Sequence, residues 1–219
     1  YTEYVESFLS RPEFSNHPGL LLKRDHTARV VNVIVSLGHD LALSPHDILI
    51  AQTVALFHDI GRFEQYTKHG SYLDHTSIDH GTLGVTIMKE RGVLAGMDSN
   101  LRDVIYFAVE NHNKAAISPG ANSRALLHAR LIRDADKLDI WYQLAEHYRH
   151  KDSNRDKALT VSLPDTPEIN PAVCSEVAKG RIGPIRDVRT LNDFKILQLG
   201  WAFDVYFVPT LRRVKERKY

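Results

Sequence analysis

Residues 55–60 of the chain read Ala-Leu-Phe-His-Asp-Ile, so two ionisable side chains, His58 and Asp59, follow an apolar run. Val54 and Ala55 lie four positions before His58 and Asp59, which is helical spacing. Because residues four apart share one face of a helix, both polar side chains are predicted to point inward. A buried carboxylate without a partner costs several kcal/mol, so Asp59 must meet a cation or several hydrogen-bond donors.

Four further ionisable residues lie on the apolar faces of other predicted helices, three, four, seven or eight positions from apolar neighbours. They are His26, His80, His112 and Asp136. One inward histidine is ordinarily a hydrogen-bonded core residue, but six inward ionisable residues on five helices need a common solution. A divalent metal provides one, because neutral imidazole nitrogens and carboxylate oxygens are its ligands and its charge offsets the aspartates.

The apolar spacing is helical almost throughout, and no convincing run of alternating strand pattern occurs. We therefore expect an all-α fold forming a single domain over residues 1–219. In this domain a motif-bearing core of about 20–150 carries C-terminal helices of about 171–217 packed on it. The expected helices cover about 25–42, 45–58, 77–91, 99–112, 122–150, 171–179 and 191–217, the last kinked at Pro209. The polar segments 62–74 and 151–170, which contain glycine or proline, are expected to be loops.

The composition limits the classes of partner. The chain has 28 basic and 27 acidic residues, and this balance argues against binding to nucleic-acid polymers or membrane surfaces. Cys174 is the only cysteine, so an intramolecular disulfide and a thiolate-built zinc site are excluded. The first 30 residues do not have the pattern of a signal peptide, and no apolar run approaches about 18 residues. The expected location is cytoplasmic, and the oligomeric state is left open.

The ordered set His26, His58-Asp59 and Asp136 resembles the HD-domain superfamily, whose signature is a His, a His-Asp pair and a distant Asp. The stretch His-Asp-Ile-Gly-Arg at 58–62 also looks like the common His-Asp-x-Gly-Lys/Arg ending of that family. The resemblance covers about residues 20–150. It implies a bundle of five or more helices and metal-dependent hydrolysis of phosphomonoesters or phosphodiesters of nucleotides or small phosphorylated metabolites.

The resemblance also implies how the ligands are shared. His80 and His112 fall where the two-metal members of the superfamily place extra histidines. One ion would then be held by His26, His58, Asp59 and Asp136, and Asp59 would bridge to a second ion held by His80 and His112. The ions would be Fe, Mn, Mg, Co, Ni or Zn. The residue after His112 is Asn113 and not a second histidine, which argues against assignment to the cyclic-dinucleotide phosphodiesterase branch.

Charge favours a small anionic phosphorylated substrate, since two divalent ions against two aspartates leave a net charge of roughly +2. A water activated by the metals would be the nucleophile, with Asp59 and Arg62 as the catalytic residues. Arg62, Lys114 and Arg133 are the candidate phosphate ligands. The alternatives are ordinary surface charges for Arg62 and Lys114, and a pair with Asp136 for Arg133.

Two other functions are compatible with the same residues. Some HD proteins with this six-ligand set are di-iron oxygenases, which iron dependence and oxygen consumption would reveal. A third possibility is a non-catalytic nucleotide sensor, but degenerate sensors are expected to lose His58 or Asp59, and both are present. The leading hypothesis from the sequence is therefore a metal-dependent phosphohydrolase.

Overall fold

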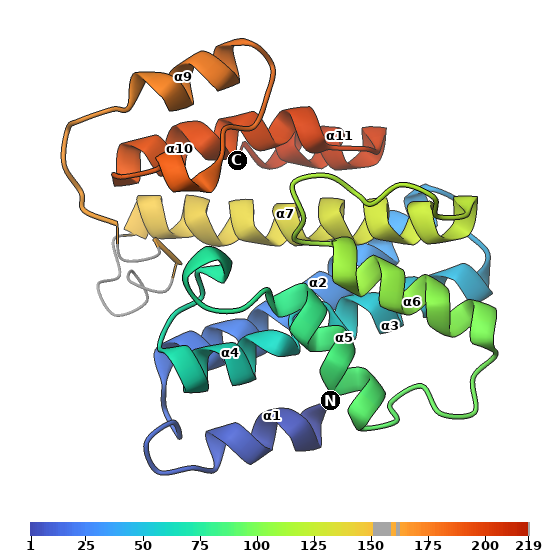
Figure 1. Cartoon of the computed structure of the whole chain (residues 1–219). Coiled ribbons are helices and arrows are strands. Elements are labelled where there is room, and N and C mark those ends of the chain that lie inside the picture. Colours follow the sequence, from blue (N-terminus) through green and yellow to red (C-terminus); the bar gives the residue numbers. More distant parts are fainter. Residues whose placement is uncertain (151–158, 161–162, 219) are drawn as a thin grey trace. The chain divides into compact units, whose positions relative to one another are not determined.

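The computed structural model describes residues 1–150, 159–160 and 163–218, and within these residues the regular secondary structure is helical and contains no strand. This confirms the all-α prediction. The chain divides into two compact units, Tyr1–Asp139 and Ile140–Tyr219 (Figure 1). The single-domain organisation expected from the sequence stays a prediction. None of the described helices combines the length and apolar character needed to cross a membrane.

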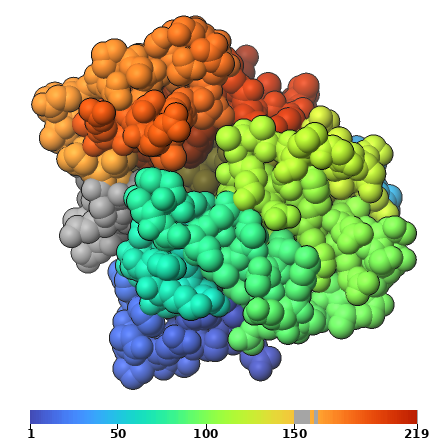
Figure 2. Space-filling model, viewed as in Figure 1, coloured from blue at the N-terminus to red at the C-terminus, as the bar shows by residue number. Residues whose placement is uncertain are grey.

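The first unit, residues 1–139, is built around a circuit of five helices. In chain order its elements are α1 (Thr2–Leu9), α2 (Pro18–Asp40), α3 (Pro45–Phe57), α4 (Gly61–His69), the 3-10 helix η1 (Asp74–Thr76), α5 (His80–Glu90), α6 (Ser99–Asn111) and the first part of α7 (Ser123–His150). Helix α2 packs against α3 and α4, α5 packs against α4 and α6, and α3 packs against α6. Segments from α4 to α6 cover the face of this unit seen in Figure 2.

Helix α3 begins at Pro45, where the sequence predicts a helix to begin, and Ser44 caps it. The Oγ of Ser44 accepts a hydrogen bond of 3.1 Å from the backbone N–H of Asp47, and Pro45 is the first helical residue. This N-cap satisfies an amide that has no partner within the helix, and proline is favoured where its missing N–H is not needed. In α2, Val30, Ile34 and Leu37 are completely buried on the face that also carries His26.

The expectation of a loop over residues 62–74 is wrong in its first part, because α4 occupies Gly61–His69. Phe63 and Gln65 are fully buried, whereas most of the other residues of this short helix are polar. Its apolar stripe is therefore too sparse to stand out by spacing alone. The helix ends at Gly70, whose φ of 64° lies in the left-handed region that favours glycine.

The second unit, Ile140–Tyr219, contains the end of α7, α9 (Pro171–Ala178), η2 (Ile185–Asp187), α10 (Leu191–Gly200), η3 (Trp201–Asp204) and α11 (Val208–Arg217). Its apolar core is Leu144, Val173, Leu191, Phe194 and Leu197. The predicted loop over 151–170 lies partly outside the described residues, and residues 163–170 have no helix or strand.

The single helix expected over 191–217 is wrong, because the chain forms two helices separated by η3. Helix α10 begins at a capping box, in which Thr190 and Asp193 each accept from the other's backbone N–H. Pro209 lies in the first turn of α11 and not in the middle of a kinked helix. Proline is tolerated in a first turn, where its missing N–H costs nothing.

Candidate metal centre

The six ligands predicted from the sequence lie together in the first unit, in two groups of three. Group 1 is His26, His58 and Asp136, and group 2 is Asp59, His80 and His112. Within each group the candidate ligand atoms all lie within 4.8 Å of one another. Among the residues that the structure describes, these are the two groups of His, Cys, Asp and Glu side chains close enough to hold a metal ion.

Group 1 joins α2, the residue after α3, and α7. The Nε2 of His26 lies 3.0 Å from Oδ1 of Asp136 and 3.3 Å from Nε2 of His58. The Nε2 of His58 lies 3.8 Å from the same Asp136 oxygen. The two histidines are buried, whereas the Asp136 side chain is 19% exposed. Two imidazole nitrogens and one carboxylate oxygen therefore face one another.

Group 2 joins the segment after α3 to the start of α5 and the end of α6. The Nε2 of His80 lies 3.2 Å from Oδ1 of Asp59 and 2.9 Å from Nε2 of His112. The Nε2 of His112 lies 3.7 Å from the same Asp59 oxygen. All three residues are buried.

Asp59 faces both groups. Its Oδ1 belongs to group 2, whereas its Oδ2 lies 3.6 Å from Nε2 of His26 and 3.7 Å from Nε2 of His58. A cation also lies beside each oxygen: Nζ of Lys23 at 2.7 Å from Oδ2, and Nε of Arg62 at 3.4 Å from Oδ1. The carboxylate is 3% exposed, so its charge is balanced by these neighbours and not by bulk water.

The ends of helices orient two of the histidines. His58 and His112 are the residues that follow the last turns of α3 and α6. Each donates its Nδ1–H to the carbonyl three residues earlier, at 2.7 Å for Ala55 and 2.6 Å for Val109. Because a carbonyl oxygen can only accept, Nδ1 carries the proton and Nε2 is directed into the site.

The protonation states suit metal ligands. Burial lowers the pKa of His58 to about 4, and burial together with Arg62 lowers the pKa of His80. Burial alone would raise the pKa of Asp59, but Lys23 and the neighbouring histidines hold it well below its usual value. Neutral imidazoles and an ionised carboxylate are the forms that bind divalent ions.

His26 differs from the other ligands. Burial lowers its pKa, but hydrogen bonds to Asp136 and Asp139 outweigh burial and raise the pKa overall. Its Nδ1 lies 2.6 Å from Oδ2 of Asp139, which Arg29 also contacts at 2.7 Å. An ion bound through Nε2 of His26 would displace the proton that Asp136 attracts there.

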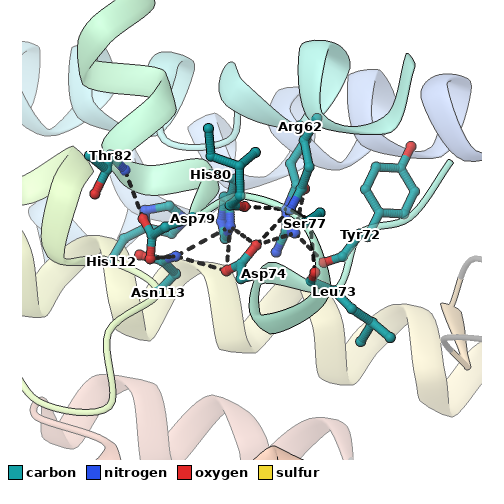
Figure 3. A network of polar contacts seen from close by, with 12 residues as sticks. Arg62, Tyr72, Leu73, Asp74, Ser77, Asp79, His80, Thr82, His112 and Asn113 are labelled. Carbon is teal, nitrogen blue, oxygen red and sulfur yellow. Dashed lines mark hydrogen bonds and ion pairs between the residues drawn. The ribbon is translucent and has the colours of Figure 1, made fainter. Parts of the chain in front are cut away.

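The three predicted phosphate ligands lie at different places. Arg62 is beside Asp59 and also donates to Asp74 at 3.0 Å (Figure 3). Lys114 pairs with Asp79 at 2.7 Å and is about one-third exposed. Arg133 is buried, and its Nη1 donates to backbone carbonyls that follow α6, among them that of His112 at 3.3 Å. The assignment of these residues to substrate binding stays a prediction.

Sequence reasoning missed three residues that touch the ligands: Lys23, Asp74 and Asp139. Asp74 contacts Nδ1 of His80 with both carboxylate oxygens at 2.8 Å. Asp139 lies three positions after the predicted ligand Asp136, which was a readable signal because such residues share a helix face. Lys23 contacts Asp59, which is 36 positions away, so spacing along its own helix does not indicate the contact.

The fold and the site together define a helical protein whose buried His and Asp groups fit divalent metal ions. A model of the HD domain family matches residues 24–141, which is more than half of the chain. The chain belongs to the HD domain family. Neither the comparison with curated proteins nor that with solved structures gave a match. Family membership indicates metal-dependent hydrolase-type chemistry, and most members are phosphohydrolases.

Proposed function

We propose that the protein is a two-metal phosphohydrolase that cleaves a phosphomonoester or phosphodiester of a nucleotide or small phosphorylated metabolite. Group 1 would hold one divalent ion and group 2 the other. The chemistry that divalent ions supply in such sites is acidification of water and stabilisation of negative charge on phosphoryl oxygens.

The observation that carries the proposal is the position of Asp59. Its two oxygens face separate sets of imidazole nitrogens, at 3.6 and 3.7 Å for His26 and His58, and at 3.2 and 3.7 Å for His80 and His112. A carboxylate placed in this way can donate one oxygen to each of two ions. A single-ion site would need only one of the two histidine pairs.

The charges around Asp59 favour an anionic substrate. Lys23 and Arg62 are 17% and 15% exposed, so both are partly accessible to solvent beside the bridging carboxylate. With divalent ions on Asp59, these two cations are no longer needed to balance its charge. They can then bind phosphoryl oxygens, Arg62 through its planar guanidinium and Lys23 as a compact point charge.

The test begins with metal analysis of protein purified without oxygen. The protein is then assayed with a panel of phosphomonoesters and phosphodiesters, supplied in turn with Mn²⁺, Mg²⁺, Fe²⁺, Co²⁺, Ni²⁺ or Zn²⁺. We expect two ions per chain and release of phosphate or of an alcohol product. Asp59→Asn should lose both ions and at least about 100-fold in activity, because it removes the shared anionic ligand.

The matched control is Asp25→Asn, the same chemical change one residue from His26. The Asp25 side chain is 41% exposed, belongs to neither ligand group and pairs with Arg24, so this variant should bind metal and turn over as the parent does. Binding of no more than one ion at saturating supply, or full activity in Asp59→Asn, would overturn the proposal. Oxygen consumption by the iron form without ester cleavage would favour the di-iron oxygenase instead.

A further inference from the structure

The two ligand groups support their histidines in the same way. In each group, one imidazole donates its Nδ1–H to a backbone carbonyl of the preceding helix, as His58 and His112 do. The other imidazole has a carboxylate behind its Nδ1: Asp139 behind His26 and Asp74 behind His80. Neither of these carboxylates belongs to group 1 or group 2.

The carboxylate behind His26 is held rigidly. Oδ2 of Asp139 lies 2.6 Å from Nδ1 of His26, and both Asp139 oxygens receive hydrogen bonds from Arg29, at 2.7 and 3.1 Å. The Asp139 side chain is 2% exposed. A buried carboxylate fixed by a guanidinium has little freedom to turn, so the His26 ring is held with Nε2 toward group 1.

The carboxylate behind His80 is fixed by a wider network, drawn in Figure 3. Asp74 accepts from Arg62 at 3.0 Å, from the amide of Gln65 at 2.8 Å and from the amide of Asn113 at 2.9 Å. Gln65 is completely buried and comes from α4, whereas Asn113 follows α6. Asp74 lies in a short 3-10 helix, and residues from α4 and from the segment after α6 hold it in place.

We propose that Asp139 and Asp74 are positioning residues, one for each metal ion, that act through His26 and His80 without touching an ion or the substrate. The proposal rests on the proposed function for the presence of the two ions. Each carboxylate would fix one imidazole in the orientation that presents Nε2 to its ion. Loss of such a partner commonly weakens metal affinity about 10- to 100-fold.

The central experiment is a calorimetric titration of metal-free protein with Mn²⁺, comparing Asp74→Asn and Asp139→Asn with the parent and with Asp25→Asn. Each positioning variant should weaken one of the two binding events about 10- to 100-fold and leave the other near the parent value. The two variants should affect different events. Adding each change to His112→Ala or to His26→Ala identifies the event, since those backgrounds disable group 2 or group 1.

A second measurement does not depend on metal. In metal-free protein labelled with ¹⁵N-histidine, the His80 ring should be in the form protonated at Nδ1, because Asp74 accepts that proton. Asp74→Ala should shift the His80 signals toward a mixture of tautomers, whereas Asp25→Asn should leave them unchanged. The His80 signals are assigned from their loss in His80→Gln.

The results separate this inference from the proposed function. Unchanged Mn²⁺ binding in both positioning variants, or weakening of the same event in both, would overturn the inference while the two-ion site stands. A parent protein that binds fewer than two ions would overturn the proposed function. In that case the His80 tautomer in Asp74→Ala still decides whether Asp74 positions His80, and an unchanged tautomer would refute it.

Discussion

Among single residues, His128 in α7 is a buried imidazole that lies outside both ligand groups. It is completely buried, and its Nε2 lies 3.4 Å from Oδ1 of Asp47. Burial lowers the pKa of His128 below the unfolded value of 6.5, and the neighbouring Asp47 only partly offsets this effect. The folded state therefore binds fewer protons than the unfolded state at pH values just below 6.5.

The consequence is a loss of stability on acidification. The contribution of neutral His128 is fully present above pH 6.5 and is lost as the pH falls toward the folded-state pKa, by up to about 1.4 kcal/mol per pH unit. His128→Gln has no proton to take up, so its free energy of unfolding should fall less between about pH 7.5 and about pH 5.5. Urea unfolding of metal-free protein at both pH values measures this, and identical losses in parent and variant would contradict it.

The candidate metal ligands could be predicted from the sequence, but most of the residues that contact these ligands could not. The helical steps around His26 and Asp136 indicate inward faces, and an ionisable residue on such a face is conspicuous. Lys23 is different, because a lysine near the start of a helix ordinarily lies in solvent. Asp74 lies outside the long helices, so no periodicity indicates its direction, and only contacts from residues far apart in the chain place it.

Among the elements, the approach of α4 to α5 depends on Gly61. A Cβ added at Gly61 would overlap the backbone carbonyl oxygen of His80 and lie 2.9 Å from the backbone nitrogen of Gly84. Neither backbone atom can move without moving α5, whose first residue is the candidate ligand His80. The sequence Asp-Ile-Gly-Arg thus has glycine where one helix meets the backbone of another.

We therefore expect Gly61→Ala to destabilise the protein by about 1–3 kcal/mol and to weaken Mn²⁺ binding at group 2. Gly84→Ala is the matched comparison, since its Cβ would meet a side-chain carbon of Ile60 at 3.3 Å, which can shift. Thermal unfolding and the calorimetric titration give both quantities. A Gly61→Ala variant no less stable than Gly84→Ala would show that the close approach is not required.

The errors in predicting elements have physical causes. The apolar residues of α4 are too few to reveal its period, although Gly70 after Lys68 and His69 was a readable end signal. Over residues 191–217, Pro209 could be assigned either to a kink or to a first turn. Trp201 and the residues after it are compatible with a helix by composition, so only the tertiary structure separates α10 from α11.

In the whole molecule, the ligands are distributed unevenly. All six candidate ligands belong to residues 1–139, and they come from parts of the chain as far apart as α2 and α7. The second unit has an apolar core of its own, and none of its described residues belongs to either ligand group. Metal binding should therefore stabilise the packing of the helices of the first unit against one another.

Removal of metal tests this distribution. A metal ion whose concentration is about 100 times its dissociation constant stabilises the form that binds it by about 2.7 kcal/mol. Two ions that bind independently contribute about twice this free energy. Because the added stability belongs to the helices that carry or precede ligands, adding Mn²⁺ to chelator-treated protein should slow amide hydrogen exchange in α2, α3, α5, α6 and the first part of α7. Exchange in α9, α10 and α11 should change little.

The metal-free protein should remain folded, since the first unit is filled by apolar and fully buried residues such as Val30, Ile34 and Ala108. Hydrogen-exchange mass spectrometry with and without Mn²⁺ resolves the two units, which a single melting temperature cannot do. Asp59→Asn provides the control, because it should abolish the Mn²⁺-dependent slowing in α2, α3, α5, α6 and the first part of α7 together. Equal slowing in both units would mean that the ions stabilise the whole chain, and slowing confined to the second unit would place the metal elsewhere.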